Sequence, residues 1–477
     1  MPRQTPSPPA RNAAAGSRPD VAFLVYRSLR QRRKDDTYDG NDNIGGKVVA
    51  DVLERSGIRV GYCTPETAHE HPLVLVSLTS TADVHAYYRA VVQLPSWQPG
   101  RRQHRVLAGG FGMQNPTALR HWIDWAAFGR VEDWIIPVVE AVLGGGRPPD
   151  HPGLMHLPDL HPVRIQQASR LYPHRVGWWQ EEFTGCPLKC KFCHYTYARR
   201  HQGTDGAYVQ TMLSDSMPEL TWDQVATYPQ KAGRIRAAID GTSMRLRYLY
   251  GKRIADDDIV RAVERIGRYG PGATTLLVYN IGGMPTETRD DWESLYATLR
   301  RCRPRHQVIF VLHTTPFRPS AATPMQWEAA DLSDLSRLRE QTIVRRDAFY
   351  ATHSYTIETP WSHLLSLVAE RATPTPECDR LMHAISCSPR LRRGRDAEKL
   401  ALARREYDLS PYVREYDPEE AHPTWFLDGW MPREQMVRMA RRMREQARRS
   451  IEEPGWIPGH GSMVEYAVRR QSLAMVE

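Results

Sequence analysis

Three cysteines in one short stretch carry the clearest chemistry in this sequence. Cys186, Cys190 and Cys193 are separated by three and then two residues, in the run Gly-Cys-Pro-Leu-Lys-Cys-Lys-Phe-Cys-His. Thiolates at this spacing can fold around one small cluster of soft metal ions. A four-iron cluster takes four ligands, so three cysteines would leave one iron open to a ligand from outside the protein, much as a catalytic zinc site keeps an open position.

A structural zinc loop and a set of merely buried cysteines are the alternatives. A closed zinc site would need a fourth ligand at ordinary spacing, and the only neighbour is His194. Because this residue directly follows Cys193, it is badly placed to complete a tetrahedron. We therefore favour an iron–sulfur cluster.

The composition is typical of a large enzyme of a reducing compartment. A chain of 477 residues should form two or three domains with substantial cores. The remaining four cysteines are scattered and make no disulfide framework: Cys63, Cys302, Cys378 and Cys387. No apolar run is long enough for a signal peptide or a membrane span. We therefore expect a cytoplasmic protein with a disordered tail over residues 1–19.

The net charge is +9, and most of the positive residues are arginines. They concentrate in residues 27–34, 390–405 and 438–449, the last two runs being interleaved with Glu and Ala at helical spacing. Few aromatic residues alternate with these arginines, so no stacking platform for bases is evident. We expect solvated helix faces and neither a nucleic-acid nor a membrane partner.

Elements that could position a cofactor come before the cysteines. Residues 20–150 alternate between strands, expected at 21–26, 58–63, 73–78 and 106–110, and helices, expected at 47–56 and 84–92. This pattern predicts an α/β domain with a doubly wound parallel sheet, which binds ligands at the carboxyl ends of its strands. Those ends carry small residues that leave room for a bulky cofactor: Gly45, Gly46, Ser77, Thr79, Ser80, Gly109, Gly110 and, beside them, Phe111.

The cysteine pattern, with Phe192 before its last cysteine and Gly-Cys-Pro at its start, resembles the cluster loop of radical S-adenosylmethionine (SAM) enzymes. The resemblance implies a 4Fe-4S cluster whose open iron is chelated by the amino and carboxylate groups of SAM. In that family an electron from the cluster cleaves SAM to a 5′-deoxyadenosyl radical. It also implies an external electron donor of the flavodoxin or ferredoxin type.

Residues 20–150 resemble the cobalamin-binding domain that precedes the radical SAM domain in one large subgroup. The matching pieces are residues 76–80, residues 106–110 followed by Pro116, and residues 128–132, where Gly129 stands in a Gly-x-x-E-like element. A Rossmann-like domain for another nucleotide is the alternative, but no G-x-G-x-x-G follows the first strand. The Asp-x-His-x-x-Gly motif is missing too, so the resemblance implies a cobalt without a histidine beneath it. For His69, His71 and His85 we expect core or surface positions.

Residues 237–247, with Lys252 and Ile254 after them, resemble the family's strand that ends in G-x-E-x-x-S-x-x-x-L-R. Asp240 would replace the acidic residue that approaches SAM, with a reach shorter by one methylene, and Ser243 is the serine of the pattern. Arg245 or Arg247 could pair the SAM carboxylate through two hydrogen bonds.

Two later stretches also match the family. Residues 282–288, after a strand at 276–281, resemble a Gly-x-Pro-x-Glu-Thr turn before a helix that begins near Asp290. For Glu287 and Thr288 we expect helix capping rather than chemistry, with Thr288 or Asp290 as the N-cap. Residues 317–327, after a strand at 308–313, resemble the Phe-x-Pro-x-x-x-Thr-Pro-x-Gln-Trp segment of cobalamin-dependent members, and this is the most specific match outside the cysteine loop.

The rest of the chain is helical by pattern, with apolar spacing of three and four over residues 335–349 and 436–450. In the subgroup, such a segment commonly closes the active site. Its aromatics between Tyr355 and Trp430 are more often core than pocket residues.

Together these patterns predict an N-terminal doubly wound cobalamin-binding domain (20–150), a partial (β/α) radical SAM barrel (151–330) and a helical C-terminal region (331–477). The resemblance implies a methyltransferase that moves a methyl group from SAM through methylcobalamin to a carbon of a small-molecule or peptide substrate. Three alternatives stay open. They are a radical SAM cyclase or rearrangement enzyme, an RNA-modifying radical SAM enzyme, and a binding protein stabilised by a closed metal site.

Overall fold

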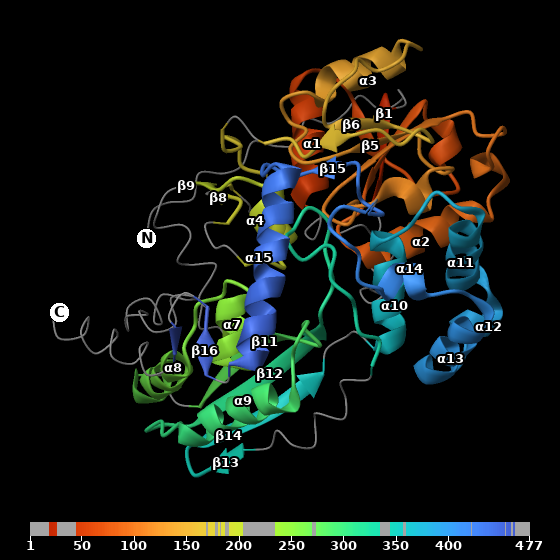
Figure 1. Ribbon diagram of the computed structural model, residues 1–477. Coiled ribbons are helices and arrows are strands. Elements are labelled where there is room, and N and C mark those ends of the chain that lie inside the picture. Colours follow the sequence, from red (N-terminus) through yellow and green to blue (C-terminus); the bar gives the residue numbers. More distant parts are fainter. Residues whose placement is uncertain are drawn as a thin grey trace, which may run out of the picture.

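The computed structural model describes residues 19–25, 44–167, 170–176, 180–181, 183–186, 190–203, 234–269, 273–333, 344–355, 359–420, 422–453, 455–458 and 461–462. The expected tail falls outside these ranges up to residue 18. Two separate α/β sheets and a group of C-terminal helices make up the described structure (Figure 1).

The first sheet contains six strands in the order β2-β1-β3-β4-β5-β6. Its strands are β1 (Val21–Val25), β2 (Val60–Tyr62), β3 (Leu73–Ser77), β4 (Arg105–Gly109), β5 (Trp125–Ala127) and β6 (Leu154–His156). All pairings are parallel except that of β6 with β5. This is a doubly wound order in which the chain reverses direction between β1 and β3, which confirms the fold class expected for the N-terminal domain. The sheet also extends past residue 150, because β6 joins it.

Helices cover both faces of the first sheet because every strand residue of β3 is buried. Leu73 and Leu75 pack in one core with helices α1 (Ile44–Arg55) and α3 (Ile135–Leu143). Val74 and Val76 point to the opposite face and pack in another core with helix α2 (Thr81–Val92). Side chains of a strand alternate between faces, so an unbroken apolar run requires a cover on both.

The second sheet has the order β10-β11-β12-β14-β13. Its strands are β10 (Arg234–Ala238), β11 (Thr274–Gly282), β12 (Val308–Pro316), β13 (Val344–Arg346) and β14 (Phe349–Tyr355), and only the edge strand β13 runs antiparallel. Burial alternates strictly along β11 and along most of β12. Helices α7 (Met244–Leu249), α8 (Asp256–Tyr269) and α9 (Arg289–Arg301) follow β10 and β11, as in βα units.

One expected helix is wrong in its described part. Residues 344–349, expected to be helical, contribute to strands β13 and β14, while residues 334–343 lie outside the described ranges. Val344 and Phe349 are buried in the core of the second sheet, where pairing with β12 outweighs the local periodicity. The second sheet therefore extends to residue 355, beyond the boundary at 330.

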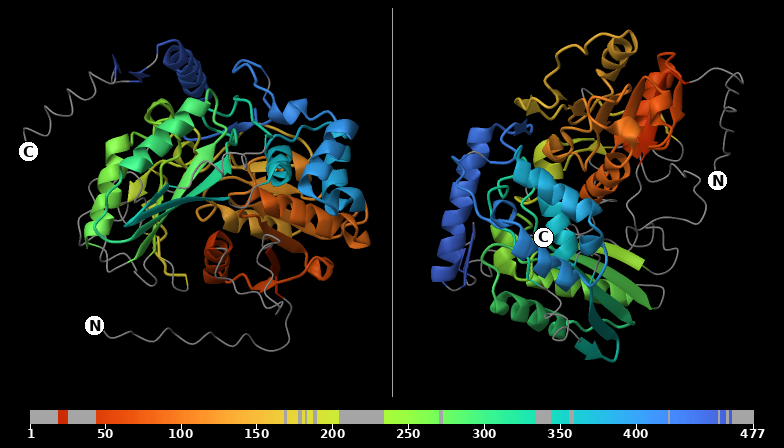
Figure 2. Two further views of the ribbon diagram at one scale, coloured as in Figure 1. Left: turned by 90° about the horizontal axis from the view of Figure 1, so that it is seen from below. Right: turned by 90° about the vertical axis from the view of Figure 1, so that its right-hand side faces the viewer.

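The C-terminal region is otherwise helical, as expected. Its helices are α10 (Pro360–Glu370), α11 (Pro376–Cys387), α12 (Pro389–Arg392), α13 (Asp396–Glu406), α14 (Ser410–Val413) and α15 (Arg433–Glu452). Figure 2 shows α10–α14 lying beside the first sheet, on the far side of the molecule from α8 and α9. Buried residues of these helices share one core with α2, so the first domain and the C-terminal region pack as a unit.

Short elements complete the described structure. They are β7 (Val163–Arg164), paired with β15 (Leu427–Asp428), β8 (Phe183–Thr184), paired with β9 (Gln202–Gly203), β16 (Trp456–Ile457), paired with β17 (Gly461–Ser462), and α4 (His194–Ala198). Short 3₁₀ turns lie in the first domain at Ala68–Glu70, Pro95–Trp97 and Pro116–Leu119.

No helix among the described residues combines the length and the apolar character needed to cross a bilayer.

Candidate functional site

A cavity of about 370 Å³ opens at the carboxyl ends of the first sheet. Seven of the eight strand-end residues expected here line it, together with Gly129: Gly45, Gly46, Ser77, Thr79, Gly109, Gly110 and Phe111. Ser80 does not. It is the N-cap of α2, where its side chain accepts from the backbone at Asp83 while Asp83 accepts from the Ser80 amide. The cavity lies where the strand order reverses, as the doubly wound topology predicts.

Two of these glycines are required by close backbone approach. Gly110 has φ +107°, and a Cβ there would lie 2.3 Å from the Leu78 carbonyl oxygen. Gly129 has φ +83°, and its Cβ would lie 2.3 Å from the Gln166 carbonyl oxygen. Both conformations and both distances exclude an ordinary side chain. The loops after β4 and β5 can therefore fold back tightly and leave the cavity open.

Four further residues of the cavity wall were not anticipated from the sequence. Arg130 pairs with Glu181 through two hydrogen bonds, 2.5 and 2.9 Å long, and both side chains are 7% exposed. Tyr195 and Arg199 come from α4 and its C-cap, directly after the third cysteine. Their positions next to Gly129 and Cys193 are the only signal that the sequence offers for them.

The cysteine loop lies against the second sheet's first helix. The Lys191 amide donates to the Tyr250 carbonyl (2.9 Å), and Phe192 packs against the core around α7. Cys186 and Cys190 are buried, Cys193 is partly exposed, and none forms a disulfide. Among the described residues, no three His, Cys, Asp or Glu side chains are arranged to hold a single metal ion. A four-iron cluster makes a different demand, because each cysteine then binds its own iron.

His194 connects the cysteine loop with the cavity. Its Nδ1 lies 2.6 Å from the Ala321 carbonyl oxygen, so this nitrogen carries the proton and donates. Burial lowers the pKa of His194 to about 4, which keeps the ring neutral. The ring packs edge-on against Phe111 at 5.4 Å. His194 thus joins the cavity wall, the loop and the segment 317–327, and is not turned back towards a metal by its neighbours.

The segment 317–327 lies between the two sheets. Arg318 donates to Thr81 Oγ1 (3.1 Å) at the start of α2 and to Glu370 (3.2 Å) at the end of α10. Phe317 packs in the core around α7, whereas Trp327 packs in the core of the first domain. This stretch therefore fixes the first domain relative to the second.

The residues expected to bind SAM meet at the carboxyl end of β10, but protein groups already engage their side chains. Asp240 forms an ion pair with Lys252 (3.0 Å), and Ser243 caps α7 and donates to Asp291 (2.5 Å). Both are polar groups held in place by buried partners. Any role towards SAM would have to begin from these contacts.

Both arginines expected at the SAM carboxylate have other partners in the structure, which corrects that expectation. Arg245 pairs with Asp291 through two hydrogen bonds and also donates to the Thr286 carbonyl. The Arg247 side chain is fully buried and is held by the Ile254 and Gly241 carbonyls and by Asp256. These acceptors come from α8, α9 and the turns beside them, whose approach the local sequence does not reveal.

The expected capping of α9 is confirmed for Thr288. Its side chain and that of Asp291 form a reciprocal capping box. Glu287 makes different contacts, because its carboxylate accepts from Thr242 Oγ1 (2.7 Å) and from the Gly283 amide (2.5 Å). It therefore ties together the chain segments that follow β10 and β11.

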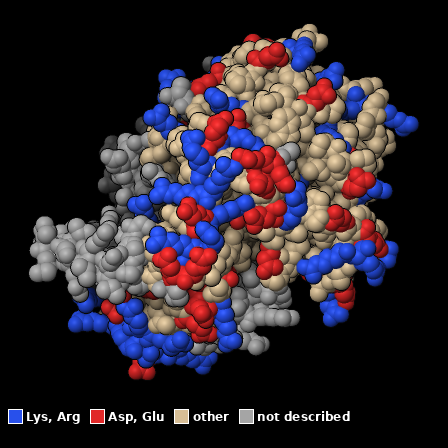
Figure 3. All heavy atoms as spheres, in the orientation of Figure 1, with Lys and Arg blue, Asp and Glu red and all other residues tan. Residues whose placement is uncertain are grey.

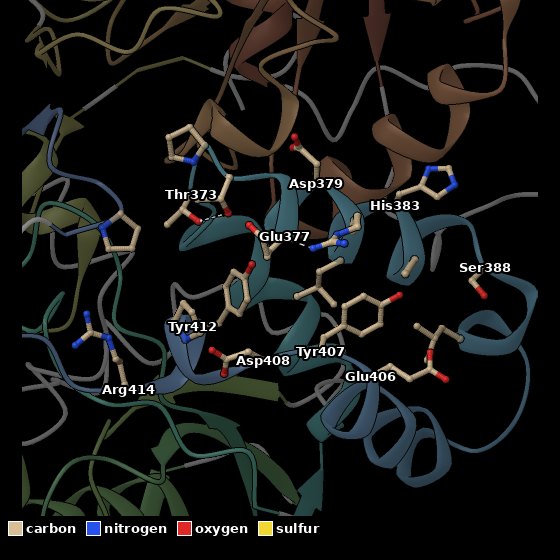
Figure 4. Close-up of a pocket in the computed structure, with 18 of the residues that line it drawn as sticks. Thr373, Glu377, Asp379, His383, Ser388, Glu406, Tyr407, Asp408, Tyr412 and Arg414 are labelled. Atoms are coloured by element: carbon tan, nitrogen blue, oxygen red, sulfur yellow. Dashed lines mark hydrogen bonds and ion pairs between the residues drawn. The ribbon is translucent and has the colours of Figure 1, made fainter.

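The C-terminal region contains a larger cavity of about 1,420 Å³, formed entirely by residues 373–425 (Figure 4). Aromatic and charged side chains face it from several helices, including Tyr407 and Tyr412 with Glu377 and Arg414. Tyr412 is nevertheless buried and belongs to the shared core, in line with the expected core role of these aromatics. No cysteine of the 186–193 loop and no strand end of either sheet contributes to this cavity.

Comparisons with known proteins give structural neighbours only. No family model matches the chain, and no curated protein matches it. Among solved structures, the cobalamin-dependent S-adenosylmethionine radical enzyme OxsB with aqua-cobalamin bound is similar at a TM-score of 0.40 and 9% identity, covering 91% of this chain and 80% of that one. OxsB with both aqua-cobalamin and S-adenosylmethionine bound gives a TM-score of 0.39 and 11% identity over the same shares.

Proposed function

We propose that this chain is a cobalamin-dependent radical SAM enzyme. The observation that carries the proposal is the position of α4. This helix begins directly after Cys193, and Tyr195 and Arg199 line the cavity at the carboxyl ends of the first sheet. The loop with three thiols and the glycine-lined cavity are therefore two sides of one place in the fold.

The donor set of the loop fits an iron–sulfur cluster. Cys186, Cys190 and Cys193 supply soft ligands without a disulfide, within a loop anchored through the Lys191 amide. In the proposal these three cysteines hold the cluster, and SAM takes the remaining iron. The cluster supplies one-electron reduction when it is bound. The protein itself would hold the loop fixed against α7 and shield it with Phe192.

The cavity fits part of a cobalamin. Its volume of about 370 Å³ is near the lower end of ligand pockets, ~300–1,000 Å³. A whole corrinoid with its nucleotide is larger, so the cavity would take one arm and the macrocycle would lie outside it. Ser77 and Thr79 offer hydroxyl groups, and Gly110 and Gly129 keep the loops low. None of the described lining residues is a histidine, consistent with a cobalt that has no histidine beneath it.

Methyl transfer to a carbon of a small molecule or peptide is the finer part of the proposal. It rests on the match of residues 317–327 to cobalamin-dependent members, since that segment bridges both sheets through Arg318 and Trp327. Rearrangement or cyclisation without methyl transfer remains the second candidate, because it needs the same two cofactor sites. The bridging segment does not favour either.

Anaerobic reconstitution tests the proposal. Iron and sulfide should bind, added hydroxocobalamin should be retained on desalting with a changed visible spectrum, and SAM should be consumed under reducing conditions. Mass spectrometry with SAM deuterated in its methyl group then separates methyl transfer from rearrangement. A protein that binds iron but leaves the hydroxocobalamin spectrum unchanged would contradict the cobalamin part. A cluster that leaves SAM intact would contradict the radical part.

A further inference from the structure

Helix α15 covers the cysteine loop on the side that faces solvent. Its residues Met443 and Ala447 pack in the same core as Phe192 of the loop. Gln446 Oε1 accepts from Lys191 Nζ at 3.4 Å. Just before the helix, Trp430 donates to the Thr196 carbonyl of α4 (2.9 Å), and near its end Ser450 accepts from Arg245 (2.9 Å). The helix is thus fixed along the loop over most of its length (Figure 1).

The opposite face of α15 is strongly basic. The helix has seven arginines and three glutamates. Arg438, Arg442 and Arg448 are exposed and form no ion pair with the described part of the chain. Figure 3 shows basic side chains along the line that α15 follows in Figure 1, with acidic ones between them. Three unneutralised charges on one ordered helix form a surface that attracts an acidic partner.

The place of this surface decides what kind of partner fits. An α-helix with its side chains is about 10–12 Å across. A protein docked on the outer face of α15 would therefore be separated from the cysteine loop by roughly one helix diameter. Buried thiols at the loop leave no exposed approach through Cys186 or Cys190 themselves. A partner that must exchange only an electron has no need of direct contact with them.

We propose that the outer face of α15 docks a small acidic one-electron carrier, a reduced flavin or iron–sulfur protein. The carrier loses one electron, the cluster at the cysteine loop gains it, and no bond is made or broken. This inference rests on the proposed function. An RNA strand is the less favoured occupant, because α15 contains no aromatic residue on which bases could stack and its arginines are interspersed with glutamates.

The test reverses the charges. The variant Arg438→Glu, Arg442→Glu, Arg448→Glu should weaken the affinity for reduced flavodoxin by about tenfold or more, as measured by titration of labelled flavodoxin at low ionic strength. For the wild-type protein, the affinity should fall as salt is added, because the contact is electrostatic. Dithionite, which needs no docking, should support SAM cleavage equally in variant and wild type.

A matched control carries the same change of charge elsewhere. Arg392, Arg393 and Arg404 are exposed, form no ion pair with the described residues, and lie on or beside α12 and α13. Their reversal to glutamate should leave flavodoxin affinity within about twofold of wild type.

The outcomes separate this proposal from the proposed function. Equal flavodoxin affinity in the two triple variants would overturn the docking surface alone. So would a loss of affinity for a single-stranded RNA oligonucleotide in the α15 variant with flavodoxin binding unchanged. Absence of SAM cleavage with dithionite in the wild-type protein would overturn the radical function, and the docking proposal with it.

Discussion

Glu287 offers a quantitative test of the second sheet. Its carboxylate joins the segments after β10 and β11 through Thr242 and Gly283, and burial raises its pKa to about 7 from an ordinary value of 4.5. The raised pKa means that the folded state prefers the neutral acid. Replacement by glutamine removes the titration and keeps one carbonyl oxygen as an acceptor.

The sign and size of the effect follow from proton linkage. A pKa raised by about 2.5 units corresponds to ~3 kcal/mol at 1.36 kcal/mol per unit. Between about pH 4.5 and 7 the folded state binds more protons than the unfolded state, so stability falls as pH rises through this window. Above pH 7 the whole penalty is present. Glu287→Gln should therefore stabilise the sheet by about 2 kcal/mol at pH 8, after a loss of ~1 kcal/mol for the poorer hydrogen bonding, and destabilise it by about 1 kcal/mol at pH 5.

Hydrogen exchange of peptides from β11 and α9, corrected for intrinsic rates, measures the free energy of opening at each pH. Glu293→Gln is the matched control, because Glu293 lies on α9 with 45% of its side chain exposed. Its replacement should leave the pH dependence unchanged. The reasoning is refuted if wild type and Glu287→Gln show the same slope between about pH 5 and 8.

Three further changes probe the site. Cys193→Ser should lose most of the iron bound on anaerobic reconstitution while hydroxocobalamin is still retained; iron analysis and the visible spectrum check this, and equal iron content would contradict it. Gly110→Ala should cost ~2–4 kcal/mol in the first domain, because of its φ of +107° and the contact with Leu78, whereas Gly45→Ala, with nothing within 4 Å of its Cβ, should change stability by less than about 1 kcal/mol; denaturant unfolding compares them, and equal stabilities would argue against the tight turn. Gly109→Leu should fill the cavity and abolish cobalamin retention with the iron content intact, since a Cβ there meets only Ala127, at 3.4 Å; retention of cobalamin would place that cofactor elsewhere.

The sequence predicts the cavity well because the doubly wound pattern is local. Each strand and helix before residue 110 has its own periodicity, and the carboxyl ends of parallel strands must meet at one edge. Gly109 and Gly110 therefore could be assigned to the same site as Ser77 from spacing alone. The match of residues 317–327 also pointed correctly to a segment shared by both domains.

The roles that the sequence missed depend on contacts between distant elements. Arg247 looked available for a ligand carboxylate, but Asp256 and two carbonyl groups enclose it. Arg130 and Glu181 are 51 residues apart and meet only in the folded chain. The strand at Phe349 was missed because its pairing partner β12, and not its own periodicity, determines its conformation.

The central claim is that the cysteine loop and the cavity of the first sheet form one two-cofactor site. Electron paramagnetic resonance of the reconstituted protein, carrying cob(II)alamin and a reduced cluster together, tests this claim directly. We expect the two spins to interact, with the cobalamin signal broadened or relaxing faster than in the protein without iron. A cobalamin signal that is identical with and without the reduced cluster would contradict the account.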